Sequence, residues 1–302
     1  MPDKERKQMN ITTQKRKIHP AIGFPLAIVV GIAIAYAGVG AYRHFVNPGA
    51  AGLKTLDEET VMLRMTGSFS NQGAIDADTA VPTIQAVCGN PKTKTVIFYL
   101  HSEGGSGVEA ERISNAITRH CEKKETIALV EGACLSACYQ VAVRADRIYT
   151  NQFSYIGSIG TIVTWTDYAK QLAAQGVEER QIASGPKKGG TFGSMMLTPA
   201  QVDNLQQVVT SSGKAFIDEV VQFRKGKLIA TSGIEDGGVY SGQDALRVGL
   251  VDAIKTVDDL RDQYPEMKEL DNTYTGRVME IKPRKSETKL ADAMERAQNA
   301  VR

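Results

Sequence analysis

Strand-like and helix-like segments alternate between residues 61 and 130, and this alternation restricts the possible folds more than any other feature of the chain. The apolar runs 61–65 (VMLRM), 95–100 (TVIFYL) and 126–130 (TIALV) have the composition of buried strands, and the segments 74–87 and 108–120 between them are helical in pattern. Such an order is typical of parallel strands joined by helical crossovers. We therefore predict an α/β domain with a βαβ core.

Further elements follow the third strand, which we expect to end at Glu131 and Gly132. The chain shows no internal repeat and no low-complexity tract, so one domain of ordinary size with appendages is predicted. The expected strands are 147–150 (RIYT), 157–164 (GSIGTIVT) and 180–185 (RQIASG), and the expected helices are 167–175 (DYAKQLAAQ) and the long amphipathic stretch 199–224.

Two glycine-containing loops follow neighbouring predicted strands, SEGGSG after Leu100 and EGACLS after Val130. Open parallel sheets place their sites beyond the carboxyl ends of the strands, so both loops are expected to line one crevice. The second loop carries a single hydroxyl, Ser136, among small residues. Two interpretations stay open on these residues alone: a nucleophile raised on a tight strand-to-helix turn, or a cap for a helix that begins near Ala137.

A serine nucleophile needs a base, and the four histidines of the chain all precede Ser136, which excludes a triad in the order serine, then histidine. Only His101, at the end of a predicted strand beside the glycine loop, is a plausible histidine base. Lysine is the other candidate, because Lys187 and Lys188 follow the predicted strand 180–185. A lysine base must be neutral, a form that a dry crevice favours. Two solvated loop lysines are the alternative interpretation.

The run from residue 21 to residue 42 carries no charged side chain. At about 1.5 Å per residue a helix of this length crosses a hydrocarbon core of about 30 Å, so we predict a transmembrane helix. A cleaved signal peptide is the competing interpretation, but the apolar region of a signal peptide is usually shorter, about 7–15 residues. Basic residues before this run outnumber those just after it, which predicts a cytoplasmic N-terminus and a body outside the cytoplasm, as in a single-pass protein of a bacterial inner membrane.

The chain has a net charge of +2, and most of this excess lies in the N-terminal tail. The body is then nearly neutral and shows no basic stripe, so nucleic acid is not expected as a partner.

A compartment outside the cytoplasm permits disulfides among the four cysteines. Cys88 and Cys121 each end a predicted helix just before a strand, so a bridge between them is one expected possibility. Cys134 and Cys138 are most simply small buried packing residues, with a sulfur nucleophile as a minor alternative. Their C-x3-C spacing without further ligands gives no support for a metal site.

Six short segments follow one another along the chain: SEGG (102–105), SACY (136–139), ADRIYTN (145–151), YIGSIG (155–160), SGPKK (184–188) and YSGQDALRVGLVD (240–252). In this order they resemble motifs of the signal peptide peptidase A family of membrane-anchored serine proteases. That family typically shows S-P-G-G, S-G-G-Y, A-D-x-I-Y-A-N, T-G-S-I-G, S-G-x-x-K and Y-x-G-x-x-A-x-x-x-G-L-V-D. The resemblance covers about residues 61–259.

The resemblance implies a role for five residues of this chain. Ser136 matches the nucleophile, and Lys188 matches the general base. Ser158 matches a serine that helps to orient the lysine. The backbone N–H groups of Gly104 and Ala137 match the donors that would hold the oxyanion.

The resemblance also implies the crotonase-like fold shared with Clp proteases, peptide substrates, and no cofactor or metal. Relatives form homo-oligomeric rings in which neighbouring subunits complete each active site, so Lys188 of one subunit can serve Ser136 of the next. The expected substrates are released signal peptides or small unfolded segments, with an apolar or small residue before the cut. The expected organisation is a cytoplasmic basic tail (1–20), the transmembrane helix (21–42), a linker (43–60), the protease domain (61–264) and a C-terminal extension (265–302).

This sequence departs from the family pattern at three positions near the predicted site. Glu103 replaces the usual proline and either weakens oxyanion binding from inside the crevice or is solvated at the loop tip. Cys134 and Cys138 replace small residues. A catalytically silent family member that acts as an oligomeric membrane scaffold is therefore the second interpretation beside a Ser/Lys endopeptidase. A crotonase-type acyl-CoA enzyme fits less well, because such chemistry has no use for a body outside the cytoplasm.

Overall fold

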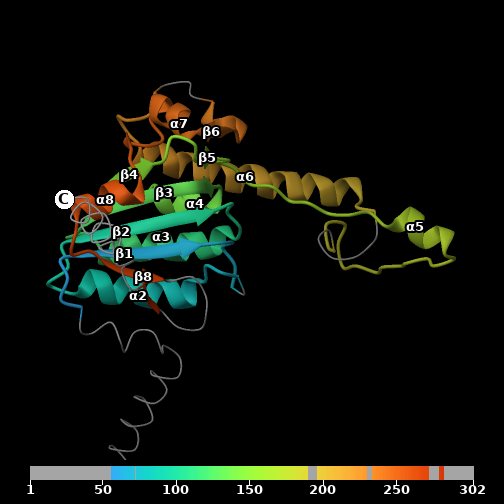
Figure 1. Cartoon of the computed structure of the whole chain (residues 1–302). Coiled ribbons are helices and arrows are strands. Elements are labelled where there is room, and N and C mark those ends of the chain that lie inside the picture. The colour runs from blue at the N-terminus through green and yellow to red at the C-terminus, as the bar shows by residue number, and fades with distance from the viewer. Residues whose placement is uncertain (1–55, 72, 190–195, 230–232, 272–278, 282–302) are drawn as a thin grey trace, which may run out of the picture. The chain divides into compact units, whose positions relative to one another are not determined.

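The computed structural model describes residues 56–71, 73–189, 196–229, 233–271 and 279–281 (Figure 1). The chain divides into two compact units, residues 1–47 and residues 48–302, and every described residue belongs to the second unit. The predicted membrane span 21–42 lies outside the described residues. Among the helices that are described, none is both long enough and apolar enough to cross a bilayer.

The described strands form one mixed sheet that is built on the predicted βαβ order. The path through the sheet is β6-β5-β3-β2-β1-β8-β9, with β4 beside β3 and β7 beside β4. Adjacent strands run parallel except in the pairs β5–β6 and β8–β9, which are antiparallel. The strands are β1 (Thr60–Thr66), β2 (Thr95–Ser102), β3 (Glu125–Leu135), β4 (Arg147–Thr150), β5 (Tyr155–Gly157), β6 (Val239–Ser241), β7 (Ala253–Ile254), β8 (Lys268–Asp271) and β9 (Met279–Ile281).

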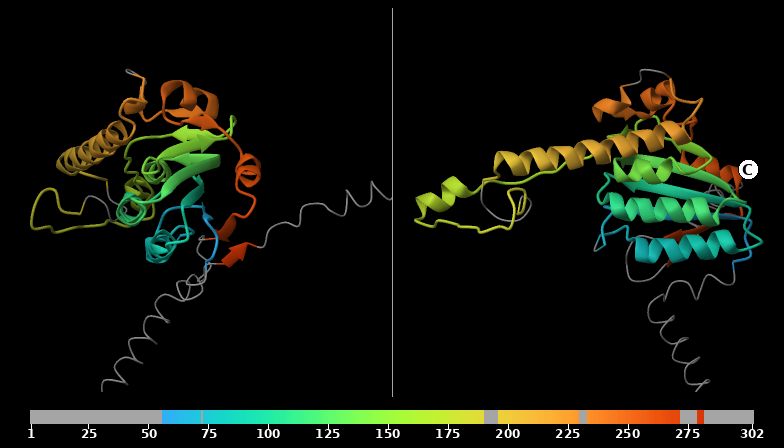
Figure 2. Two further views of the ribbon diagram at one scale, coloured as in Figure 1. Left: turned by 90° about the vertical axis from the view of Figure 1, so that its left-hand side faces the viewer. Right: turned by 180° about the vertical axis from the view of Figure 1, so that it is seen from behind.

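Helices cover both faces of this sheet, and their starts show the expected capping chemistry. The Ser106 side chain accepts a hydrogen bond at the start of α3, and Thr198 and Gln201 form a reciprocal capping box at the start of α6. Figure 2 shows α2 and α3 side by side on one face. The helices are α2 (Ala77–Gly89), α3 (Gly107–His120), α4 (Ala137–Ala142), α5 (Ala169–Ala174), α6 (Pro199–Phe223), the 3-10 turn η2 (Ile234–Asp236), α7 (Gly242–Val248) and α8 (Val257–Gln263).

The period-2 alternation of each strand divides the core between the two faces of the sheet. Leu63 of β1 lies in the larger core with side chains of α2, α3, α4 and α6, whereas its neighbour Met62 points to the other face. There Met62 belongs to a smaller core with Leu260 of α8. Because the central strands are covered on both faces, they read as continuous apolar runs in the sequence.

Most of the predicted elements are present, and the expectation of an α/β domain with a βαβ core is confirmed. Three expectations are wrong. Of the predicted strand 157–164 only Gly157 is in a strand, and 180–185 forms no strand. The third strand does not end at Glu131, because β3 continues to Leu135 after a shift of its register against β2. Such a bulge absorbs residues that do not fit the ladder. β8, which follows residue 264, pairs with β1 in the same sheet.

Candidate active site

Ser136 is the single residue between the end of β3 and the start of α4. Its backbone has φ 52° and ψ −122°, a conformation that residues with a side chain rarely adopt. The residue occupies the cap position of α4, yet its side chain makes no capping hydrogen bond. The capping interpretation therefore explains the position of Ser136 but gives its half-buried hydroxyl no task.

Two serines near the end of β3 have positive φ values. Among the described residues, Ser136 and Ser158 (φ 51°) are the two residues other than glycine with a positive φ. They are close in the fold, because the Ser136 N–H donates to the Gly157 carbonyl oxygen at 2.8 Å and the Ser158 N–H donates to the Gly238 oxygen at 2.8 Å. Unfavourable backbone conformations persist where the surroundings over-determine them, and they cluster at functional sites.

The first glycine of the SEGG segment lies directly against the serine turn. A β-carbon built on Gly104 would lie 2.9 Å from Ser136 Cβ and 2.8 Å from the Leu135 carbonyl oxygen, and the φ of Gly104 is 104°. Only glycine fits this approach of the two loops. The sequence therefore predicted correctly that the loops after β2 and β3 meet.

The backbone of Gly104 lies close to the Ala137 amide, since the same built atom would be 3.3 Å from the Ala137 nitrogen. The Ala137 N–H is the first amide of α4, and the first amides of a helix have no acceptor within the helix. The Gly104 N–H donates to Ser102 Oγ at 3.0 Å. The role of both amides stays a prediction, and an oxyanion at Gly104 would have to replace that hydroxyl.

Lys188 is exposed in a turn, and the backbone of this turn is well connected. Its N–H donates to the Gly185 carbonyl oxygen at 3.1 Å, and its carbonyl oxygen accepts a hydrogen bond from Gln201 at 2.9 Å. Lys187 is exposed as well. Within the part of the chain that the structure describes, no hydrogen bond joins either lysine side chain to Ser136. In the single chain the predicted nucleophile and the predicted base are therefore not hydrogen-bonded to each other.

Two other residues near the loops have clear surroundings. The His101 ring is tied to the backbone of β3, because Nδ1 lies 2.8 Å from the Glu131 carbonyl oxygen and 3.3 Å from the Ala133 nitrogen. Glu103 is exposed at the loop tip, which corresponds to the solvated one of the two predicted alternatives.

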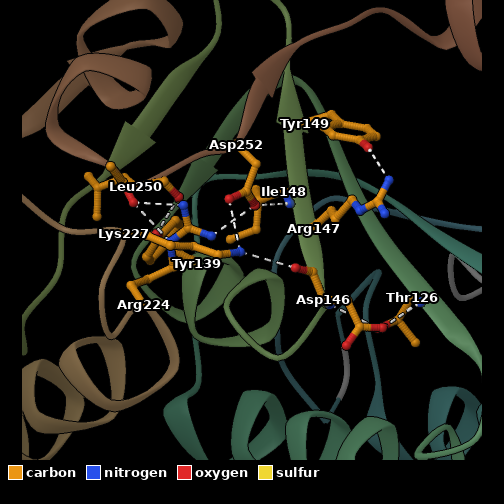
Figure 3. Close-up of polar contacts among 11 residues, drawn as sticks. Thr126, Tyr139, Asp146, Arg147, Ile148, Tyr149, Arg224, Lys227, Leu250 and Asp252 are labelled. Carbon is orange, nitrogen blue, oxygen red and sulfur yellow. Dashed lines mark hydrogen bonds and ion pairs between the residues drawn. The ribbon is translucent and has the colours of Figure 1, made fainter.

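A buried polar cluster holds the first turn of α4 in place. The sequence analysis did not predict this cluster. The Tyr139 hydroxyl donates to the Leu250 carbonyl oxygen at 2.6 Å (Figure 3), and Tyr139 is fully buried. Burial raises the pKa of this phenol well above its ordinary value, so the hydroxyl stays a donor. Because Tyr139 lies three residues after Ser136, this bond holds the first turn of α4 to the segment before β7.

Arg224 and Asp252 complete this cluster beside Tyr139, as Figure 3 shows. The buried Arg224 guanidinium donates to the Gly249 carbonyl oxygen at 2.9 and 2.7 Å and to Asp252 Oδ2 at 2.9 Å. Lys227 Nζ lies 2.9 Å from the other oxygen of Asp252, and the Ile148 N–H donates to Oδ2 at 2.7 Å. Burial raises the pKa of the Asp252 carboxyl, but the hydrogen bonds from Arg224, Ile148 and Lys227 outweigh it, so this pKa lies below its ordinary value. The sequence feature that could have indicated this cluster is the G-L-V-D end of the 240–252 motif, which contains Gly249, Leu250 and Asp252.

Both cysteine pairs form disulfides. The Cys88–Cys121 bridge joins the ends of α2 and α3, with Cα atoms 5.0 Å apart, and confirms that expectation. Cys134 and Cys138 are fully buried as expected, but they are bonded to each other, with Cα atoms also 5.0 Å apart. The sequence did not predict this pairing, because sequence spacing alone does not show that the turn at Ser136 brings the two cysteines together.

The family model for peptidase family S49 matches residues 119–271, just over half of the 302 residues. The chain belongs to peptidase family S49. The matched segment contains Ser136, Ser158 and Lys188. Membership agrees with the resemblance to signal peptide peptidase A proteins that the six motifs carry.

Curated relatives are similar over parts of their length. The chain is 29% identical to a putative protease of Methanocaldococcus jannaschii over 59% of this chain and 58% of that protein. It is 27% identical to a putative protease of Synechocystis over 66% of this chain and 73% of that protein. A putative signal peptide peptidase of Enterococcus faecium is 28% identical over 59% of this chain and 52% of its own length. Among solved structures, a 1510-N membrane-bound stomatin-specific protease aligns over 70% of this chain and 87% of that chain, at 16% identity and a TM-score of 0.46.

Proposed function

We propose that this S49 family member is a serine endopeptidase with Ser136 as its nucleophile. The observation that carries the proposal is the backbone of Ser136, held at φ 52° between β3 and α4 with a hydroxyl that caps nothing. Sharp strand-to-helix turns of this kind raise a serine above the end of a parallel sheet in hydrolases. The first amide of α4 and the Gly104 loop lie beside it, where an oxyanion would form.

The proposed base is Lys188, supplied by a neighbouring copy of the chain. Support comes from the segment between Ser158 and Lys188, which exposes large apolar side chains in the single chain. Ile162 is 84% exposed, Trp165 is 49% exposed and Ile182 is fully exposed. Apolar surface of this extent marks an interaction site. In the homo-oligomeric ring that we propose, this segment packs on the next subunit, and burial there favours the neutral lysine that can accept the Ser136 proton.

We further propose a single-pass anchor at residues 21–42, with a cytoplasmic N-terminus and a catalytic domain outside the cytoplasm, as in a bacterial inner membrane. The absence of charge in 21–42 and the basic tail before it support this arrangement. The two disulfides are consistent with an oxidising compartment. The domain would take the crotonase-like fold shared with Clp proteases. The substrates would be released signal peptides or small unfolded segments, cut after an apolar or small residue.

The first test compares hydrolysis of unstructured peptides by the full chain and by Ser136→Ala. We expect a loss of at least about a thousandfold in kcat, as for other serine nucleophiles. Ser211→Ala, an exposed serine on α6, is the matched control and should keep the activity of the parent. If Ser136→Ala is as fast as the parent, the nucleophile is misassigned. If the parent and the variant are both inactive across varied peptides, the scaffold interpretation replaces the protease.

The second test mixes two inactive variants, Ser136→Ala and Lys188→Ala. If the base comes from a neighbouring subunit, random mixing in a ring creates intact sites at about a quarter of the positions, so activity returns. Lys187→Ala should be active alone. If the mixture stays inactive while each variant still assembles, the base is not shared between subunits. Loss of activity in the Lys187 variant with retention in the Lys188 variant would move the base by one residue.

A further inference from the structure

Two cysteines stand symmetrically about the proposed nucleophile, two residues before it and two residues after it. Cys134 lies near the end of β3 and Cys138 lies in the first turn of α4. They form a disulfide, and both residues are fully buried in the larger core. The bridge therefore closes a small covalent ring whose middle residue is Ser136.

The backbone of Ser136 needs support, because its φ of 52° is unfavourable for a residue with a side chain. Its N–H is held by the Gly157 oxygen at 2.8 Å, and its carbonyl oxygen accepts from the Tyr139 and Gln140 amides at 2.8 and 3.2 Å. These hydrogen bonds fix the peptide groups on either side of Ser136. They leave the angle between the end of β3 and the axis of α4 to side-chain packing.

We propose that the Cys134–Cys138 disulfide is a positioning element that holds Ser136 in its reactive conformation, and that reduction of this bond lowers the rate of catalysis. The catalytic part of this inference rests on the proposed function. Neither cysteine touches the substrate. The disulfide acts through Ser136, because it fixes the strand end and the helix start whose junction raises the hydroxyl. Positioning of reacting groups to within an ångström carries a large share of enzymatic rate.

Reduction of the Cys134–Cys138 disulfide by a dithiol is a balanced reaction. A thiolate of the dithiol attacks one of the two sulfurs, and a mixed disulfide forms. The second thiolate of the reagent then displaces the protein sulfur and closes a cyclic disulfide. Two electrons and two protons pass to the protein, so Cys134 and Cys138 each end as thiols, and the reagent is oxidised. An oxidising agent of the disulfide class reverses the reaction.

The second disulfide of the chain provides a matched control. Cys88 and Cys121 are also almost fully buried, and their Cα atoms are also 5.0 Å apart. Their bridge lies before β2 and β3 begin, whereas Cys134 lies where β3 ends, so it is at the opposite end of these strands from Ser136. Loss of the Cys88–Cys121 bridge should therefore lower stability without changing the geometry at the serine.

The decisive experiment measures kcat and KM for peptide hydrolysis by the full chain, by Cys134→Ala/Cys138→Ala and by Cys88→Ala/Cys121→Ala. The first variant should lose about tenfold or more in kcat with KM within about twofold, the pattern of a lost transition-state interaction. The second variant should keep both constants. Amide hydrogen exchange at Tyr139 and Gln140, which donate to Ser136, should speed up in the first variant alone. A first variant with the kcat and the exchange rates of the parent overturns the inference.

Reduction of the native bond tests the same inference without a substitution at Ser136 or its ring. In Cys88→Ala/Cys121→Ala the Cys134–Cys138 bond is the one that remains. Dithiothreitol is raised until two thiols per chain are titrated, and the activity should fall and return on reoxidation. Full activity with two titrated thiols overturns the inference. If the parent hydrolyses no peptide, the proposed function fails, and the exchange rates of the Tyr139 and Gln140 amides still decide whether the disulfide holds the turn.

Discussion

Replacing Arg224 by methionine removes the buried cation of the cluster below α4 while keeping much of the side-chain volume. Arg224 is 1% exposed, and its side chain donates two hydrogen bonds to the Gly249 oxygen and one to Asp252. Leaving a buried acceptor such as the Gly249 oxygen without a donor costs about 1–3 kcal/mol. Breaking a buried ion pair from one side costs about 3–5 kcal/mol. Asp252 keeps Lys227 and the Ile148 N–H, so we expect a value near the lower limit, about 3 kcal/mol.

The control for this prediction is the second cation on the same carboxylate. The Lys227 side chain is 41% exposed and lies 2.9 Å from Asp252 Oδ1, so Lys227→Met should cost less than about 1 kcal/mol, as exposed ion pairs do. Urea unfolding of the full chain and both variants measures the two losses. A loss below about 1 kcal/mol in Arg224→Met, or equal losses in the two variants, would refute the reasoning that burial sets the value.

The stability lost in Arg224→Met should also depend on pH. Because the pKa of Asp252 is lowered in the folded protein, its ion pairs stabilise the fold above the ordinary aspartate pKa, and this contribution is lost as the pH falls through the lowered value. In Arg224→Met the pKa of Asp252 should rise toward the ordinary value. The difference in unfolding free energy between parent and variant should then shrink in acid. A difference that stays constant from neutral pH to about pH 3 would show that Asp252 does not carry it.

Three further outcomes follow from the described geometry. Cys88→Ala/Cys121→Ala removes a bridge over a sequence separation of 33 and should lower the unfolding free energy by about 4 kcal/mol in urea, whereas an unchanged midpoint would contradict the bridge. Gly104→Ala should abolish peptide hydrolysis, since the new methyl would lie 2.9 Å from Ser136 Cβ, while Gly107→Ala, with open space around it, should keep the parent rate. With Lys188 as base, hydrolysis should be faster at about pH 9 than at about pH 6, whereas a rate that levels off near pH 7.5 would indicate a histidine base.

The sequence predicted those strands and helices whose structure follows from the residue pattern of the segment itself. The runs at 61–65, 95–100 and 126–130 are mostly apolar because both faces of β1, β2 and β3 contribute side chains to a core. The meeting of the loops that hold Gly104 and Ser136 was also predictable, because parallel strands end at one edge of a sheet.

The remaining features depend on contacts that the local sequence does not contain. The segment 180–185 was predicted as a strand, yet it has no neighbouring strand within the described chain, and a strand needs a partner for its ladder. The continuation of β3 past Gly132 depends on a register shift opposite Ser102. The Arg224–Asp252 pair and the disulfide about Ser136 likewise arise only when the fold has brought their partners together.

The contacts that hold Ser136 also have an order in time, because a chain is synthesised from its N-terminus. The Tyr139 hydroxyl is bonded to an oxygen that lies 111 residues later, at Leu250. Ser158, whose neighbour Gly157 holds the Ser136 amide, is itself bonded to Gly238. Before these later residues are synthesised, β1, β2 and β3 of a growing chain can form their hydrogen-bonded pairs. The chain still lacks the hydrogen bonds to Leu250 and Gly238 that support the serine turn. Domains form on the ribosome as their residues emerge. The nucleophile is therefore completed among the last parts of the domain, and a truncated or stalled chain carries the serine without the means to use it.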